Sequence, residues 1–424
     1  MLNRNIAPLL APLSIPSLLP HQTLKLDNGI EVVYINDSSQ NVFKIDVIFE
    51  AGIYYQPKPL IASTTLNMLN EGTHLHNAEA IADLFDYYGA YIDFNCGFNK
   101  SEISLISLNK YTQETITMLA EMLTESIFPK KELEIFLSNK KQEFLVQREQ
   151  TAYLARKKFA ELLFGPTHPY ANIITPDDYN QVDITSIETF YHQHFNAKNC
   201  RLVVCGRVDH KVLECIQIHF NRLIFPKEPF IPSVSPFVPA FPQRYHVKKA
   251  NSVQSSIRIG KIGVPITSPD YPHFLLLNAI LGGYFGSRLM SNIREEKGYT
   301  YGISSFNVSI PQSSYWCIAT DVNNEHVEAT LTEINQELEK LRIELVPKEE
   351  LELVKNFLHG DLLREIDGVF NQSDALKHKL NYGLDNRIYE EIIHKINTCE
   401  AEDLLNLAQK HLNPKEMYIV TSGK

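Results

Sequence analysis

The chain has 424 residues, of which 44% are hydrophobic and 21% charged, and its formal net charge at pH 7 is −10. A globular chain of this length exceeds one ordinary core, so we expect two or more domains. The acidic balance argues against nucleic acid or an anionic membrane surface as the main partner. No uninterrupted apolar stretch reaches the roughly 18–20 residues of a membrane span.

The N-terminal stretch "MLNRNIAPLLAPLSIPSLLP" is apolar, but Pro8, Pro12, Pro16 and Pro20 interrupt it and no A-x-A cleavage pattern follows. We therefore predict an extended arm rather than a signal peptide, and we expect a cytoplasmic protein of bacterial origin. None of the six cysteines forms a C-x-x-C pair. This usage is typical of buried thiols in a reducing compartment, not of a disulfide framework.

Strands are predicted first. "TLKLDNGIEVVYI" contains two β runs around Asp27-Asn28-Gly29, which is a hairpin signal. "FKIDVIFEAG" and "YIDFNCGFNKSEISLISL" alternate in the same way. An amphipathic helix follows, with one apolar face. That face carries Ile116, Leu119, Ala120, Leu123 and Ile127.

The second half repeats this plan. The nonapeptide "FPKKELEIF" at 128–136 recurs as "VPKEELELV" at 346–354, 218 residues later. Each copy follows an amphipathic helix, and "SSIRIGKIGV" and "YTYGISSFNVSI" supply strands before the second helix. We infer an internal duplication.

The Pro-rich stretch "FPKEPFIPSVSPFVPAFPQ" separates the two halves and reads as an extended connector. We therefore predict an N-terminal domain at 1–224, a linker at 225–243 and a homologous C-terminal domain at 244–424. The predicted fold class is α+β, with each domain a mainly antiparallel sheet covered by helices.

The stretch "STTLNMLNEGT" reads as a helix that is ended by Gly72. Ser63 and Asn67 are four residues apart and share one face of it. Two histidines at this spacing would hold a zinc ion, but here the pair offers only a hydroxyl and an amide.

Four stretches, in this order, resemble the pitrilysin/insulinase family of zinc metallopeptidases, and most closely its short branch, which includes the mitochondrial processing peptidase. They are "NMLNEGT", "FGPTHPYA", "FYHQHFNAKNCRLVVCGRVD" and "FGSRLMSNIREEKGYTYGI". The family forms are H-x-x-E-H with M-L-x-x-G-T, H-P-Y-G, F-Y-x-x-x-Y-x-P-x-N, and S-S-R-L-x-x-x-I-R-E-x-x-G-L-x-Y. The resemblance covers nearly the whole chain from about Gln22, and it implies two similar α+β domains and pairing of two chains around a chamber.

The resemblance places the family's zinc motif on "STTLN". Ser63 then stands at the first histidine, Leu66 at the general base and Asn67 at the second histidine. The third ligand is expected near Gln147 or Arg148, with Glu149 one position away. Hydroxyl and amide are poor zinc ligands, Leu66 cannot act as a base, and a guanidinium repels a metal. We therefore expect no metal in this chain, and zinc in a partner chain.

Other histidines offer a weaker metal site. His76 and Glu79 have H-x-x-E spacing, but Ala80 follows where a second histidine would stand. His74 and His76 come after Gly72, which predicts a surface turn. The pair His192 and His194 falls where the resemblance implies ordinary structural positions.

The second half keeps Arg294 and Tyr301, in "REEKGYTY". The resemblance implies that this pair lies across the chamber from the zinc and hydrogen-bonds the substrate carbonyl and oxyanion. Donors aimed at an oxyanion stabilise it electrostatically. The glycines of "LGGYFGSRL" before this segment predict close packing or a mobile loop.

Three functions remain open at this point. The first is a non-catalytic subunit that binds extended peptide and supplies Arg294 and Tyr301 to a homologous chain bearing H-x-x-E-H. The second is a structural or peptide-binding pseudoenzyme that forms a homodimer. The third is a metallopeptidase with a relocated metal site that uses His74 or His76 with Glu79.

Overall fold

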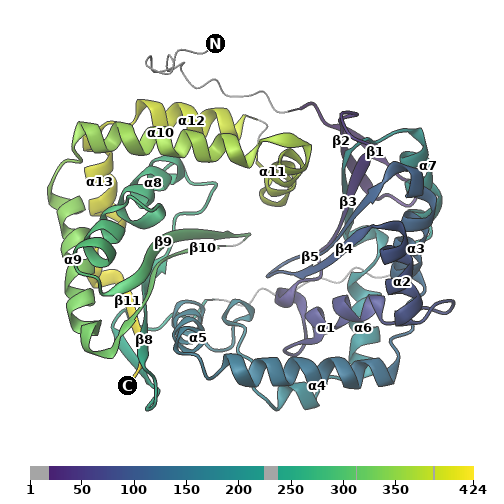
Figure 1. Ribbon diagram of the computed structural model, residues 1–424, viewed down its shortest axis with the longest axis horizontal. Coiled ribbons are helices and arrows are strands. Elements are labelled where there is room, and N and C mark those ends of the chain that lie inside the picture. Colours follow the sequence, from purple (N-terminus) through teal and green to yellow (C-terminus); the bar gives the residue numbers. More distant parts are fainter. Residues whose placement is uncertain (1–18, 224–236, 312, 385–386) are drawn as a thin grey trace, which may run out of the picture.

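The structure is a computed structural model that describes residues 19–223, 237–311, 313–384 and 387–424. Its strands form two mixed sheets, one in each half of the chain (Figure 1). The first sheet contains β1 (Gln22–Lys25), β2 (Glu31–Asn36), β3 (Val42–Phe49), β4 (Tyr91–Cys96), β5 (Ser101–Leu108) and β6 (Cys200–Gly206). The second contains β7 (Arg244–Lys248), β8 (Gln254–Ile262), β9 (Thr300–Ile310), β10 (Ser313–Asn323) and β11 (Tyr418–Gly423).

The two sheets share one topology. The first has the order β1-β2-β6-β3-β5-β4 and the second β7-β11-β8-β10-β9. In each sheet one pair, β2 with β6 or β7 with β11, is parallel, and the other pairs are antiparallel. Apart from β1, the strands of each half therefore occupy the same places in the same chain order. The predicted duplication and the mainly antiparallel α+β fold are confirmed.

Helices cover these sheets. Those of the first half are α1 (Ile61–Asn67), α2 (Ala78–Tyr88), α3 (Thr112–Thr124), α4 (Lys130–Gln147), α5 (Thr151–Phe164), α6 (Ile184–His194) and α7 (His210–Phe220). Those of the second are α8 (Tyr271–Asn278), α9 (Val327–Ile343), α10 (Lys348–Glu365), α11 (Gly368–Tyr382), α12 (Ile388–Thr398) and α13 (Ala401–His411). The second half also has two π-helical segments, η7 (Ala279–Gly283) and η8 (Met290–Glu296).

Local sequence explains the main boundaries. Gly29 has φ +87° in the turn between β1 and β2, a conformation that favours glycine, and the predicted hairpin is confirmed. The side chain of Asp209 accepts from the Val212 amide and so caps α7. The apolar faces of α3 and α9 are buried largely as predicted, in separate cores of the two halves.

Each half also packs one of its helices against the sheet of the other half. Helix α5 of the first half packs its buried Phe159 and Leu163 against the second sheet, at Cys317 and Val420. Helix α11 of the second half packs Leu376 against the first sheet. Since α5 and α11 each follow one copy of the repeated nonapeptide and its helix, they are equivalent elements. Each half therefore supplies one helix to the other half's sheet.

Charged residues reinforce the contact at α11. Lys377 of α11 lies 2.9 Å from the carboxylate of Asp46, which is fully buried in β3, and also contacts Glu102 of β5. Lys44 lies 3.2 Å from Asp46 and 2.8 Å from Asp374 of α11. Two lysines and three carboxylates thus join α11 to the first sheet.

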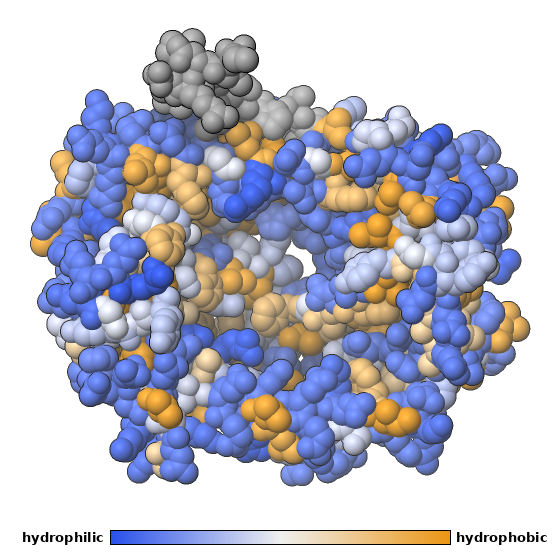
Figure 2. Space-filling view, viewed as in Figure 1, coloured by the Kyte–Doolittle hydropathy of each residue, from blue (hydrophilic) through white to orange (hydrophobic). Residues whose placement is uncertain are grey.

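The molecule is hollowed at its centre, between the two halves (Figure 2). Strands β4 and β5 point toward this hollow from one side and β9 and β10 from the other, while α1 and α5 lie below it in the view of Figure 1. Hydrophobic residues line part of its lower wall in Figure 2.

Several predictions concern the ends and the linker. Residues 1–18 of the N-terminal arm and residues 224–236, which include most of the linker predicted at 225–243, lie outside the described residues, so these predictions stay open. Beyond that gap, the amides of Val238 and Ala240 donate to carbonyls at the end of α5, at 3.2 and 2.9 Å. All six cysteines are free, and five of them are buried. In the part of the chain that the structure describes, no helix is long and apolar enough to cross a membrane.

Candidate functional site

Helix α1 carries the positions where the family's zinc motif is expected. It starts after Leu60, whose φ of +74° turns the chain, and it continues into a 3-10 turn that ends before Gly72. Leu66 and Met68 are fully buried, so they contribute to the core. The opposite side of the helix is half-exposed and carries Ser63 and Asn67.

The polar groups of this pair are used within their own helix. The Ser63 hydroxyl donates to the Leu60 carbonyl at 3.1 Å, and the Asn67 amide donates to the Ser63 carbonyl at 2.7 Å. Arg148 caps the far end of α4 and is exposed. Among the described residues, its side chain makes no hydrogen bond to Ser63 or Asn67.

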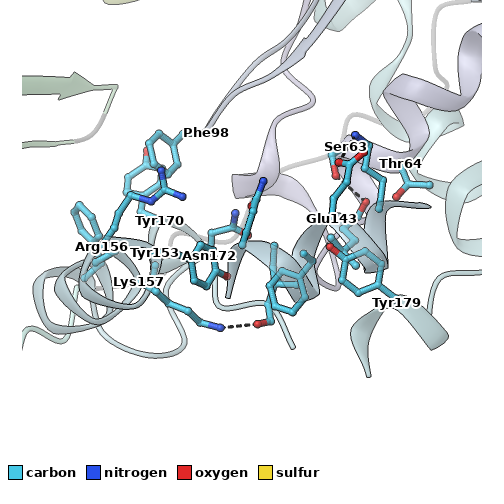
Figure 3. A pocket seen from close by; sticks show the side chains of 18 of the residues that line it. Ser63, Thr64, Phe98, Glu143, Tyr153, Arg156, Lys157, Tyr170, Asn172 and Tyr179 are labelled. Carbon is cyan, nitrogen blue, oxygen red and sulfur yellow. Dashed lines mark hydrogen bonds and ion pairs between the residues drawn. The ribbon is translucent and has the colours of Figure 1, made fainter. Parts of the chain in front are cut away.

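A pocket of about 590 Å³ opens beside Ser63 and Asn67 (Figure 3). It lies between α1, α4 and α5 and reaches Tyr315 of β10, so both halves of the chain line it. Gln147, one of the two positions expected for the third ligand, lines it, whereas Arg148 and Glu149 do not. Glu149 contacts Lys249 instead.

The acidic group of this pocket is Glu143, which the sequence analysis missed. It lies one helical turn before Gln147 on α4 and lines the pocket with Ser63 and Asn67. Figure 3 shows it beneath Ser63. The i, i+4 spacing to Gln147 was the available signal, because residues at this spacing share a helix face.

These side chains do not fit a zinc ion. Such a site needs imidazole, thiolate or carboxylate donors, usually three from the protein. Here the hydroxyl of Ser63 and the amide of Asn67 donate to backbone carbonyls, and the carboxylate of Glu143 lies 2.9 Å from the ammonium of Lys140. Elsewhere in the described residues, no group of three or more His, Cys, Asp or Glu side chains is placed to hold a metal.

The other histidines have structural contacts. His76 lies 2.8 Å from Glu121 of α3, and Glu79 lies in the first turn of α2. His194 is buried, its Nδ1 lies 3.0 Å from the Glu50 carbonyl, and burial lowers its pKa. A lowered pKa keeps an imidazole neutral at neutral pH, as suits a core histidine.

Arg294 and Tyr301 are brought together at the start of β9. Nε of Arg294, in η8, donates to the Tyr301 carbonyl at 3.1 Å. The guanidinium lies 4.6 Å from the ring centroid of Phe285, a cation–π contact. The Tyr301 side chain is 92% exposed, so its phenol is presented to solvent.

The π-helical segment η7, which precedes η8, is closely packed. A Cβ on Gly282 would lie 2.8 Å from the amide nitrogen of Ser305, which confirms close packing at this glycine. Tyr301 lines a second, polar pocket of about 300 Å³ with Arg258 and Asp321. No residue lines both this pocket and the one beside α1. Within one chain, the exposed phenol and the zinc-motif positions therefore face different cavities.

Comparison with known proteins agrees with this fold. The family model described as "Peptidase M16 inactive domain" matches residues 181–358. An "Uncharacterized zinc protease" of Rickettsia felis is 26% identical over 396 residues, which is 91% of this chain and 93% of the relative. The "Non-peptidase homolog YmxG" of Helicobacter pylori is 21% identical over 418 residues, which is 96% of this chain and 95% of the relative.

A solved structure shares the whole architecture. The crystal structure of a peptidase M16 inactive domain from Pseudomonas fluorescens superimposes with a TM-score of 0.86 at 25% identity, covering 96% of this chain and 98% of that one. The four resembling stretches, the duplicated topology and the family match point the same way. The chain is thus similar over nearly its whole length to proteins of the pitrilysin/insulinase (M16) peptidase family, and it resembles the non-catalytic type that lacks the H-x-x-E-H motif.

Proposed function

We propose that this chain is the non-catalytic subunit of a two-chain peptidase. Its partner is a homologous chain that bears H-x-x-E-H and zinc. In this assembly the chain binds extended peptide, encloses the chamber with its partner, and supplies Arg294 and Tyr301 to the partner's active site. The pairing of these two residues at an exposed strand start is the observation that carries the proposal.

The chemistry of the pair suits this role. A guanidinium and a phenol are both hydrogen-bond donors, and an oxyanion is stabilised by donors held in place before the reaction. Arg294 is held by the Phe285 ring and the Tyr301 carbonyl, while the phenol of Tyr301 is exposed. The Arg294 guanidinium and the backbone of Tyr301 are therefore held in place, while the Tyr301 phenol is open to solvent.

The placement of the pair favours action on a second chain. Tyr301 and the zinc-motif positions line different pockets of this chain. The local site also offers no set of donors suitable for a metal. A donor pair without a local metal can serve catalysis only where another chain brings the metal and the substrate to it.

Tyr301→Phe tests the proposal directly, because it removes one hydroxyl from an exposed ring and leaves the fold unchanged. The chain is mixed with the H-x-x-E-H homologue from the same genome, and cleavage of a fluorogenic decapeptide is measured. We expect kcat of the complex to fall by about 10²–10³, the effect of losing one oxyanion donor.

Tyr87→Phe is the matched control, since Tyr87 is 81% exposed on α2 and lies in the other half of the chain. We expect it to leave kcat unchanged. Size-exclusion chromatography establishes that each variant assembles. If an assembled Tyr301→Phe complex cleaves as fast as the Tyr87→Phe complex, the role in catalysis is wrong.

The second candidate is a peptide-binding pseudoenzyme that forms a homodimer. The pocket beside α1 favours it, because its aromatic walls could hold a peptide without any partner. Light scattering separates the two candidates. A stable homodimer that binds peptide and does not exchange subunits with the zinc-bearing homologue supports this candidate and overturns the first.

A further inference from the structure

The pocket beside α1 has an apolar body. Phe159, Phe164 and Tyr170 are buried along it, and Phe98 and Tyr315 complete an aromatic wall. Its volume of about 590 Å³ falls within the roughly 300–1,000 Å³ of pockets that take small ligands. It can therefore hold a few side chains of a peptide, and not a folded partner.

The charges of the pocket do not balance. It is lined by the cations Lys140, Arg156 and Lys157 and by one carboxylate, Glu143. Lys140 and Glu143 pair with each other at 2.9 Å. Among the described residues, Arg156 and Lys157 have no carboxylate within 4.0 Å. The pocket thus presents two positive charges that are not paired directly with a carboxylate, beside aromatic rings.

Both cations belong to α5 but are placed differently. Lys157 is half-buried, and its Nζ donates to the Ile174 carbonyl at 2.5 Å. Burial lowers the pKa of Lys157, and the charge of Arg148 lowers it further. Figure 3 shows Arg156 rising from α5 beside Phe98 and Tyr170. Arg156 is exposed, and its guanidinium lies 5.8 Å from the ring centroid of Tyr153. An anion here would meet a guanidinium that has no paired carboxylate and would offset the desolvation of a partly buried ammonium.

A ligand that fits these walls carries a carboxylate next to a large apolar group. The C-terminal residue of a peptide meets this requirement, because its carboxylate and its side chain share one Cα. An internal aspartate or glutamate lacks the apolar group. Guanidinium binds carboxylate through two parallel hydrogen bonds, which a C-terminal amide cannot accept as an anion does.

We propose that this pocket binds the free C-terminus of a peptide that ends in an aromatic or large aliphatic residue. Arg156 contacts the carboxylate, Lys157 adds charge, and the rings of Phe98 and Tyr170 pack on the last side chain. The proposal rests on the peptide-binding function given above. It adds a preference for one end of the peptide, held where a catalytic relative would hold its metal.

The test measures binding to the full chain without a partner, by fluorescence anisotropy. The probes are a fluorescein-labelled pentapeptide, Gly-Gly-Ser-Leu-Phe, with a free C-terminal carboxylate, and the same peptide with a C-terminal amide. We expect the amide to bind at least about tenfold more weakly, since hydrogen bonds to charged groups have about this effect or more.

Arg156→Gln locates the effect. We expect it to weaken binding of the free acid about tenfold and to change binding of the amide less than twofold, so that its effect depends on the carboxylate. The matched control is Lys131→Gln, which removes the same charge from an exposed position on α4 outside the pocket. It should leave both affinities unchanged.

Three outcomes overturn this inference. They are equal binding of acid and amide, equal effects of Arg156→Gln and Lys131→Gln, and binding of dodecanoate with no binding of either peptide, which would assign the pocket to a free fatty acid. None of them touches the Tyr301→Phe assay in the complex. If Arg156→Gln leaves peptide affinity unchanged while Tyr301→Phe lowers kcat of the complex, the inference about the pocket is wrong and the proposed function still stands.

Discussion

At the residue scale, Arg294 and Tyr301 act as one unit. Because Arg294 donates to the Tyr301 carbonyl, its removal also frees the backbone that positions the phenol. We predict that Arg294→Ala lowers kcat/KM of the two-chain complex by about 10²–10³. The double variant with Tyr301→Phe should lose less than the product of the two single losses, since residues that act together are not additive.

A double-mutant cycle in kcat/KM measures this coupling. Lys297→Ala provides the control, because it removes a neighbouring cation that lies 3.9 Å from Glu333 and does not contact Tyr301. It should leave the rate unchanged. Strictly multiplicative losses would mean that Arg294 and Tyr301 work independently, contrary to this arrangement.

The sequence located the positions of the zinc motif on α1, but it did not predict the pocket around them. Ser63, Leu66 and Asn67 follow from helix spacing and the resemblance, and local spacing is what a sequence records. The role of Glu143 depends on how α4 packs against α1, two elements far apart in the chain. Arg148, five residues later, points elsewhere because α4 ends there. Rotation of one helix against another is set by packing that no local pattern specifies.

At the element scale, α1 and α4 bring three polar side chains to the wall of one pocket. Ser63, Asn67 and Glu143 line one pocket, and two of them need only imidazoles to become ligands. We predict that the double variant Ser63→His, Asn67→His binds one zinc ion per chain, through two histidines and Glu143. Leu66 is left unchanged because a charge at this fully buried position would be costly.

Isothermal titration with zinc, supported by metal analysis, measures the gain. Adding Glu143→Gln should weaken zinc binding by at least the 10–100-fold that lost outer-shell partners typically cause. The corresponding control is Glu134→Gln, an exposed carboxylate of α4 that does not line the pocket. If Glu143→Gln and Glu134→Gln have the same effect, Glu143 does not face the two histidines.

At the scale of the whole molecule, the duplication predicted two similar halves but not how they hold together. The repeated nonapeptide and the helix before it located α4 and α10, and the alternating apolar residues predicted a sheet in each half. The reciprocal packing of α5 and α11 was not predicted, because each helix buries its face on the other half's sheet. A sequence read one half at a time does not show which sheet a helix will cover.

The charged contact between α11 and the first sheet allows a test of how the two halves hold together. Lys377→Met leaves Asp46, inside the first sheet, with Lys44 as its remaining cation and with the hydrogen bond from the Ser104 hydroxyl. The side chains of Lys377 and Asp46 are 11% and 0% exposed, and breaking a buried pair costs on the order of 3 kcal/mol. The side chain of Asp374 is 51% exposed, so its pairs contribute less, about 0.2–1 kcal/mol. We predict that Lys377→Met lowers the free energy of unfolding at pH 7 by on the order of 3 kcal/mol, measured by urea titration.

The effect should fade in acid. Burial alone would raise the pKa of Asp374, but hydrogen bonds from Lys44 and Lys377 hold it below its ordinary value. The stability from a depressed carboxyl pKa is complete above the unfolded value of about 3.9 and is lost as the pH falls through the folded value. Burial opposes the charge of Lys377, yet Asp46 and Glu102 raise its pKa, so it stays protonated. The difference in the free energy of unfolding between wild type and Lys377→Met should therefore narrow by about 0.2–1 kcal/mol, the contribution of the Asp374 pairs, as the pH falls from about 5 to about 3. Exposed Lys415→Met should stay within about 0.5 kcal/mol of wild type throughout. An equal loss at every pH would show that the Asp374 pairs do not contribute to the effect of Lys377.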